Sequence, residues 1–327
     1  MYGVSFLKST RWAVFLFLLC GQPPAWAKQT QSVAGTAYVT SWFGGVVAVV
    51  DLASGAVKQT IPVGVHAHNV ALRPDQKQAW VTNNNAGTVS IIDTDTNTVI
   101  GTLPTGRGPR HTYFRPDGRE AYVTNEFDDR VELFDTENLD QPLGSVEVGH
   151  MPHFALAAGD KVFVTNFGGG DVTVLSRAKR KTLATVPVGA GPLGAGALKN
   201  GKRIYIACHN ANHVAVIDGE THKVLAYIPT GAGPVQVTVT PDQAHAYVAN
   251  DGAGTVQKID LATHTVLKTI HIARDAGSHG VGFAGEGRWL LITNTGAATV
   301  SVIDTTNDAV VKTIPVPKAP EGIAVKR

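Results

Sequence analysis

The sequence has 327 residues, with 28 lysines and arginines against 26 aspartates and glutamates. Its first 27 residues contain Lys8 and Arg11 but no carboxylate, so removing them would leave a net charge near zero. Because binding to a phosphate backbone draws its affinity from basic residues, this composition does not favour nucleic acid as a partner.

Residues 1–27 have the pattern of an export signal. Lys8 and Arg11 precede an apolar run, Trp12 to Leu19, and Ala25-Trp26-Ala27 matches an A-x-A cleavage site. The run is too short for a transmembrane helix, which needs roughly 20 residues. We therefore predict a cleaved signal peptide (residues 1–27), a periplasmic or secreted protein, and no membrane span after cleavage.

From Tyr38 onward the chain repeats one short motif seven times. The copies are Tyr38-Val39-Thr40-Ser41, Trp80-Val81-Thr82-Asn83, Tyr122-Val123-Thr124-Asn125, Phe163-Val164-Thr165-Asn166, Tyr205-Ile206-Ala207-Cys208, Tyr247-Val248-Ala249-Asn250 and Leu291-Ile292-Thr293-Asn294. Successive copies are 41–44 residues apart, which is the length of a four-stranded propeller blade. The runs between turns are rich in Val, Ile, Thr and aromatic residues, which favour strands. We predict an all-β, seven-bladed β-propeller with four-stranded antiparallel blades, forming a single domain over residues 28–327.

The two ends of the repeat array predict how the ring closes. The first copy begins with a second-type strand at Thr36 to Thr40 and has no inner strand before it, whereas Ala319 to Val325 follow the last copy and read as an inner strand. The C-terminal strand is therefore expected to close the first blade and to cover edges that would otherwise promote aggregation.

The Tyr-Val-Thr-Asn core and the Pro116-Asp117-Gly118 turn before it resemble the YVTN-repeat family of seven-bladed β-propellers. The resemblance covers essentially all of the mature chain. It implies the fold more strongly than any activity, because related propellers include lactonases, subunits of quinone-cofactor dehydrogenases, domains that hold haem or copper, and a reported DNA binder.

One position at the start of each inner strand holds most of the side chains that could bind a ligand. Around the ring it reads His68, Arg110, His153, Leu193, Val235, His279 and Glu321. Equivalent positions converge at the mouth of the central channel, so the candidate ligand-binding residues are His68, Arg110, His111, His153, His279 and Glu321. The alternative is that polar residues line the channel because it is filled with water.

Imidazoles bind Cu, Zn, Ni or Fe, so His68, His153 and His279 are candidate ligands for a transition metal, Cu or Zn. A weaker second cluster is Cys208, His209 and His213, since Cys208 stands where most copies have Asn. A free cysteine is, however, most often a buried small hydrophobe.

These residues favour an exported binding or scaffold protein over an enzyme. Its channel mouth would present His, Arg and Glu side chains to a small-molecule ligand, a metal or a periplasmic protein partner. Two alternatives remain open: a lactonase-like hydrolase that uses the same residues, and an accessory subunit of a periplasmic quinoprotein or cytochrome system.

Overall fold

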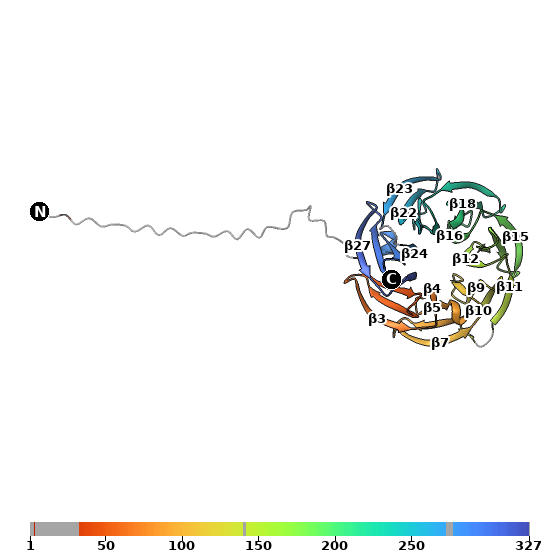
Figure 1. Ribbon diagram of the computed structural model, residues 1–327, viewed down its shortest axis with the longest axis horizontal. Helices are drawn as coiled ribbons and strands as arrows, with labels where there is room; N and C mark the ends of the chain where they lie inside the picture. Colours follow the sequence, from red (N-terminus) through yellow and green to blue (C-terminus); the bar gives the residue numbers. More distant parts are fainter. Residues whose placement is uncertain (1–2, 4–32, 140–141, 273–276, 327) are drawn as a thin grey trace. The chain divides into compact units, whose positions relative to one another are not determined.

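The computed structural model describes residues 3, 33–139, 142–272 and 277–326. From Val33 onward the chain forms one compact unit, a ring of seven four-stranded sheets (Figure 1). The expected signal peptide lies outside the described residues, apart from Gly3. Within the described ranges, no helix is both long enough and apolar enough to cross a membrane.

The blades follow one another in chain order, each with its strands antiparallel. Blades 1 to 3 contain β28 (Pro320–Lys326), β1 (Thr36–Ser41), β2 (Val46–Asp51) and β3 (Ala56–Pro62); β4 (Ala67–Leu72), β5 (Gln78–Asn83), β6 (Thr88–Asp93) and β7 (Thr98–Pro104); and β8 (Pro109–Phe114), β9 (Glu120–Asn125), β10 (Arg130–Asp135) and β11 (Pro142–Glu147). Blades 4 and 5 contain β12 (Pro152–Ala158), β13 (Lys161–Asn166), β14 (Asp171–Ser176) and β15 (Lys181–Pro187); and β16 (Pro192–Ala197), β17 (Arg203–Cys208), β18 (His213–Asp218) and β19 (Val224–Pro229). Blades 6 and 7 contain β20 (Pro234–Val239), β21 (His245–Asn250), β22 (Thr255–Asp260) and β23 (Thr265–His271); and β24 (Ser278–Ala284), β25 (Trp289–Asn294), β26 (Thr299–Asp304) and β27 (Ala309–Pro315). In the part of the chain that the structure describes, three short 3-10 helices, η1 (Asn84–Ala86), η2 (His209–Ala211) and η3 (Gly285–Gly287), lie in loops.

The predicted ring closure is confirmed. In the first blade the strand order is β28-β1-β2-β3, and β28 pairs with β1 so that Ile323 lies opposite Val39. Ile323 is buried with Val39 and Leu291 in the hydrophobic cluster between the first and last blades. The C-terminal strand therefore contributes both ladder hydrogen bonds and core packing.

The hydrophobic core is divided into seven clusters, and each cluster joins two neighbouring blades. The second and third strands supply most of it: β5 is buried from Ala79 to Asn83 and β6 from Val89 to Ile92. The fourth strands are mostly exposed, as in β7. The blades therefore stack on one another through their middle strands, and the inner strands are left to line the channel.

In five of the seven blades the third residue of the repeat motif is a threonine that joins its blade to the next one, whereas the fifth and sixth blades have Ala207 and Ala249 there. The threonine hydroxyl donates to the carbonyl of the channel-mouth residue in the following blade: Thr40 to His68 (2.7 Å), Thr82 to Arg110 (2.7 Å), Thr124 to His153 (2.8 Å), Thr165 to Leu193 (2.5 Å) and Thr293 to Glu321 (2.7 Å). The same hydroxyl oxygen accepts a hydrogen bond from a backbone N–H in the inner strand of its own blade, as in the 3.0 Å bond from His111 N to Thr124 Oγ1. The motif therefore has a structural role: it sets the position of the channel-mouth residues.

Replacing Thr124 with valine should lower the free energy of unfolding by about 1–3 kcal/mol, because it leaves a buried carbonyl and a buried N–H without partners. Valine has nearly the same shape, so packing changes little. Urea denaturation measures the effect, and T60V, in the exposed strand β3, is the matched control. Equal stability of T124V and T60V would contradict this role.

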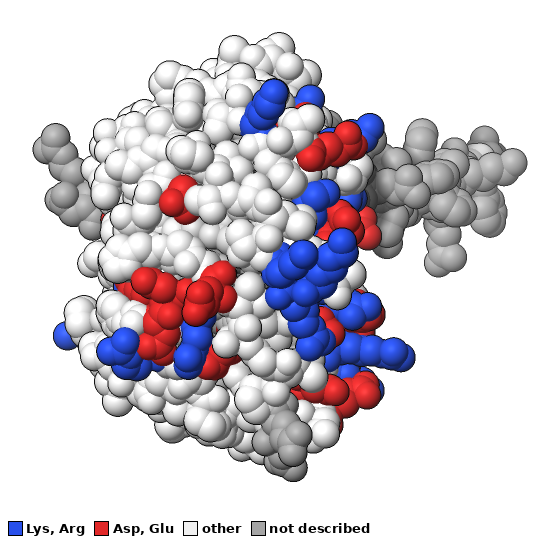
Figure 2. All heavy atoms as spheres, turned by 90° about the vertical axis from the view of Figure 1, so that its right-hand side faces the viewer, with Lys and Arg blue, Asp and Glu red and all other residues white. Residues whose placement is uncertain are grey.

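The outer side of the third and fourth blades carries charges of both signs. Figure 2 shows acidic side chains with lysine or arginine beside them on the left of that view, and a group of mainly lysine and arginine side chains toward the right, with uncharged surface between them. Arg130 pairs with Glu132 at 2.7 Å, and Arg180 with Glu120 at 3.0 Å. Opposite charges therefore lie side by side on this surface, in keeping with the nearly balanced totals for the chain.

Candidate functional site

Each inner strand reaches the channel through a β-bulge. In β4, Ala67 pairs with Asn83 and Val70 with Val81, so two residues, His68 and Asn69, lie opposite one. Strand β8 shows the same shift between Pro109 and Thr112. A bulge re-aims side chains relative to a regular ladder, so consecutive residues of one inner strand reach the channel.

The bulges build a central cavity of about 200 Å³. Its lining comes from successive pairs on the inner strands, including His68 with Asn69, His111 with Thr112, His153 with Phe154, His279 with Gly280 and Glu321 with Gly322. Five of the six residues expected at the mouth from the sequence therefore line one cavity.

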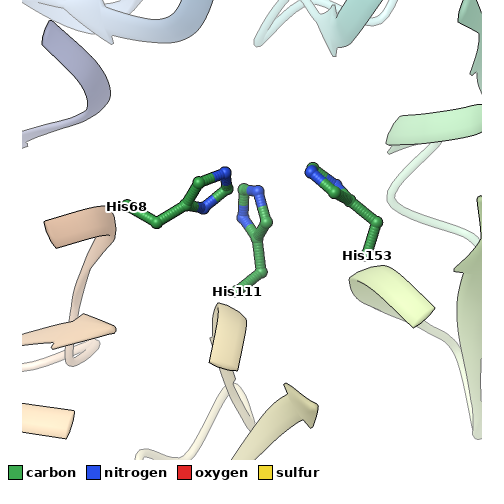
Figure 3. A group of neighbouring side chains, drawn as sticks. All are labelled: His68, His111 and His153. Atoms are coloured by element: carbon green, nitrogen blue, oxygen red, sulfur yellow. The ribbon is translucent and has the colours of Figure 1, made fainter. Parts of the chain in front are cut away.

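Three imidazoles meet at the centre of this cavity. Figure 3 shows His68, His111 and His153 pointing toward one another from three neighbouring inner strands. One ring nitrogen of each lies within 4.8 Å of those of the other two. His68, His279 and Glu321 form a second group that meets the same distance limit. Because His68 belongs to both groups, the five residues form one site.

His68 is held in a defined orientation. Its Nδ1 lies 3.0 Å from the carbonyl oxygen of Arg110, so Nδ1 carries the proton and donates. Its Nε2 faces the cavity, 3.4 Å from Oε2 of Glu321. A backbone carbonyl behind a histidine is the usual support for a metal-binding imidazole, because it fixes the tautomer.

Two buried atoms of the site have no hydrogen-bond partner among the described residues. They are Nδ1 of His153 and Oε2 of Glu321. His153 is only 6% exposed. Leaving a buried polar atom without a partner costs free energy, so both atoms are available to a ligand in the cavity.

The surroundings keep the imidazoles neutral. Burial, followed by the Arg110 charge and by the neighbouring imidazoles, lowers the pKa of His68 well below its ordinary value. Burial likewise lowers the pKa of His111 and His153, and that of His279 to about 4. Burial has the opposite effect on the Glu321 carboxyl and raises its pKa to about 8. At neutral pH the site therefore contains neutral histidines and a largely protonated glutamate.

These shifts predict how the stability of the metal-free protein depends on pH. An unfolded histidine titrates near 6.5, so between about pH 6.5 and pH 4 the unfolded chain binds more protons than the folded one, and stability falls as pH falls. Glu321 acts with the opposite sign: its raised pKa removes stability as pH rises from about 4.5 to about 8. Thermal melting in the presence of a chelator should show a shallower fall below pH 6.5 for the triple variant H68A/H111A/H153A than for the natural protein. Parallel curves would contradict the buried neutral cluster.

Arg110 does not line the cavity, unlike His111 beside it. Its Nε pairs with Oε2 of Glu126 at 2.6 Å, and its guanidinium lies 5.8 Å from the Trp42 ring centroid. Trp42 also stacks on His66, with centroids 4.4 Å apart. Arg110 thus acts on the site through its charge and its carbonyl oxygen. The sequence alignment does not separate Arg110 from His111, because both residues lie within the bulge.

Glycines let neighbouring blades approach closely around Glu321. A Cβ on Gly280 would lie 2.1 Å from the Glu321 carbonyl oxygen, and one on Gly322 would lie 2.8 Å from Cα of Asn69. Both distances are shorter than real Cβ contacts, so any larger residue would push the inner strands apart. These two glycines therefore help to set the width of the cavity.

The second proposed cluster does not converge. Cys208 is fully buried between the fourth and fifth blades, where burial raises its thiol pKa to about 12, and its Sγ lies 3.4 Å from the Val188 carbonyl oxygen. His213 bonds that same oxygen through Nε2 at 2.9 Å, and His209 lies near Asp251. Among the described residues, Cys208, His209 and His213 do not form a metal-binding group.

Fold and site together define the protein as a seven-bladed β-propeller with a histidine-lined central cavity. The chain belongs to the family described as "Lactonase, 7-bladed beta-propeller", whose model matches residues 38–218, more than half of its length. The model of the cytochrome D1 heme domain matches residues 199–324. Comparison with curated proteins gave no match.

Several solved structures share the fold at low sequence identity. A functionally unknown protein from Desulfotomaculum acetoxidans is 15% identical, with a TM-score of 0.77 over 89% of this chain and 99% of its own. Kuenenia stuttgartiensis hydrazine synthase is 18% identical, with a TM-score of 0.72 over 80% of this chain and 95% of its own. The dihydro-heme d1 dehydrogenase NirN, in complex with DHE, is 15% identical, with a TM-score of 0.69 over 89% of this chain and 75% of its own. At these identities the likeness extends to the fold alone.

Proposed function

We propose that this protein binds a divalent transition-metal ion in its central cavity, with His68, His111 and His153 as ligands. The observation that carries the proposal is the convergence of three ring nitrogens within 4.8 Å of one another. Zinc holds imidazole nitrogens at about 2.0–2.1 Å in a tetrahedral arrangement, so modest side-chain rotations bring these nitrogens to bonding distance. The sequence pointed to His279 as the third ligand, whereas the geometry favours His111.

The donor set favours particular metals. Imidazole nitrogen suits Zn, Cu, Ni and Fe, whereas Mg and Ca prefer sets of oxygen ligands. Three histidines leave a further coordination position open, as in catalytic zinc sites. His279 and Glu321 lie beside that position. We take Zn²⁺ and Cu²⁺ as the ions to test first.

The protonation state of the site supports metal binding. A metal displaces protons from its ligands, so histidines that are already neutral bind without that cost. The low pKa values of His68, His111 and His153 meet this condition at neutral pH. The carbonyl of Arg110 fixes the tautomer of His68 in the required form.

The size of this cavity favours a small ligand. Its volume of about 200 Å³ is below the range of about 300–1,000 Å³ found for pockets that hold drug-sized ligands. An ion with one small ligand fits this volume. A haem, which the match to the cytochrome D1 heme domain model raises as an alternative, would extend beyond it.

Hydrolysis of small lactones is a second candidate function. The family match and the position of Glu321 beside His68 favour it. Because its pKa is raised to about 8, the Glu321 carboxyl can donate a proton to the alcohol oxygen that leaves when a lactone ring opens. If the natural protein hydrolyses a panel of small lactones, E321Q should lower kcat by about 100-fold or more. Absence of turnover by the natural protein would remove this candidate.

We also propose that the mature chain, residues 28–327, lies in the periplasm or outside the cell. The signal pattern of residues 1–27 supports this location, and the repeat motif supports membership of the YVTN type. In this setting a binding protein would present its channel to a small-molecule ligand or a protein partner.

Metal content is the direct test of the proposal. The full chain should be produced without a histidine tag, dialysed, and examined by elemental analysis and native mass spectrometry. The expected result is one zinc or copper ion per chain, present on purification or taken up by the metal-free protein. A protein that neither carries nor takes up these ions would contradict the proposal.

A further inference from the structure

The turn between the third and fourth strands differs in the fourth blade. In the other six blades this turn begins with an aspartate, as at Asp93, whose Oδ1 accepts the backbone N–H groups of Asp95 (2.9 Å) and Thr96 (2.8 Å). The fourth blade has Ser176 there, followed by Arg177-Ala178-Lys179-Arg180-Lys181. The Ser176 Oγ accepts from Lys179 N at 3.2 Å. This turn therefore lacks the negative charge of the other six and carries four positive charges. Departures from a local rule of the fold are expected at functional sites.

This turn borders a second cavity, separate from the histidine site. Its volume is about 540 Å³, and it is lined by Arg115, Glu120, Gly159, Asp160, Arg177 and Arg180, with Ala178. It lies on the opposite face of the propeller from the channel mouth, because β12 runs from Pro152, beside the histidines, to Ala158, beside this cavity. The group of lysine and arginine side chains in Figure 2 lies on this part of the molecule.

The guanidinium groups at this cavity are held in place by contacts that use only some of their N–H donors. Glu120 Oε1 lies 3.0 Å from Nη2 of Arg180 and 3.6 Å from Nη1 of Arg115, so one carboxylate contacts two cations. Nη1 of Arg180 also donates to the Leu143 carbonyl oxygen at 3.3 Å, and Nε of Arg115 lies 3.1 Å from Asp117. Arg177 donates from Nη1 to the Gly159 carbonyl oxygen at 2.7 Å. A guanidinium has five N–H donors, so these contacts leave several for a ligand. The space beside Gly159 is open.

We propose that this cavity binds a phosphate group, either a free phosphate compound or the headgroup of a lipid. Arg115 also pairs with Asp117 at 3.1 Å, and Lys161 pairs with Asp160 at 3.1 Å. Four cations therefore surround three carboxylates, which leaves an excess of positive charge at the site. A planar fork of N–H donors matches phosphate oxygens two at a time, and a phosphate offers more acceptor oxygens than a carboxylate. The volume of the cavity leaves room for the organic group attached to the phosphate.

The test compares the full chain with R177Q/R180Q, which removes two of the cations. Calorimetric titration with inorganic phosphate at low ionic strength measures the free compound, and sedimentation with vesicles containing phosphatidylglycerol, against vesicles of phosphatidylcholine alone, measures the headgroup. The control variant is K202Q/K223Q, which removes the same charge from exposed positions in the fifth blade. Thermal melting checks that both variants remain folded.

The expected result is binding in at least one arm that weakens about tenfold or more in R177Q/R180Q and changes less than about twofold in K202Q/K223Q. Binding of phosphate alone or of phosphatidylglycerol vesicles alone identifies the source of the phosphate. The proposal is overturned if the natural protein binds neither phosphate nor phosphatidylglycerol vesicles, or if both variants bind with equally weakened affinity.

Discussion

Replacing His68, His111 and His153 together by alanine should abolish the binding of Zn²⁺ and Cu²⁺ by this protein. Loss of a residue behind a metal ligand already weakens affinity by about 10–100-fold, so loss of the ligands themselves should weaken it by more than about 100-fold. The three rings face one another across a cavity (Figure 3), so their removal takes away few core contacts and the variant should fold. Isothermal titration calorimetry measures the binding, and circular dichroism verifies the fold.

A matched control keeps this experiment specific. H150A/H271A removes two imidazoles from exposed positions and should bind the metals as the natural protein does. H279A tests the alternative ligand set, and its effect should be smaller than that of H111A. If the triple variant and the natural protein bind with equal affinity, the ions are held elsewhere and the central site is wrong.

Truncation after Lys318 should destabilise the propeller by several kcal/mol and promote association. Strand β28 supplies the inner strand of the first blade, and its removal leaves the edge of β1 without a partner and exposes the Val39 cluster. Lost ladder bonds and lost burial act together, and an open strand edge is a template for pairing with another chain. Urea denaturation and size-exclusion chromatography follow the two effects.

A chain that lacks Arg327 alone is the control for the truncation, because it keeps all of β28. It should be as stable and as monomeric as the full chain. Should the longer truncation denature at the same urea concentration as the full chain, the closing strand would have no part in stability.

The propeller fold could be predicted because the sequence pattern of one blade is repeated along the chain. Seven copies of the motif, near one spacing, define the blades, and the strand missing before Thr36 is found again at Pro320. The motif threonines could be recognised as a pattern, but their bonds to the carbonyls of His68, Arg110 and His153 depend on the stacking of blades in space.

The site could be predicted only as a set of positions. Alignment of the inner strands identified His68, His153, His279 and Glu321, which do meet in one cavity. It did not separate Arg110 from His111, because a bulge changes which side chain faces the channel. The unusual Cys208-His209 pair drew attention in the sequence, yet Cys208 lies in the core and His209 beside another blade. A motif that is unusual in sequence need not converge in space.

The proposed metal site is tested most directly by an anomalous-scattering map of crystals grown with zinc, collected on both sides of the zinc absorption edge. We expect one strong peak in the central cavity, about 2.0–2.1 Å from a ring nitrogen of each of His68, His111 and His153. A cavity without an anomalous peak, or zinc bound instead at a surface pair such as His150 with Asp129, would contradict it.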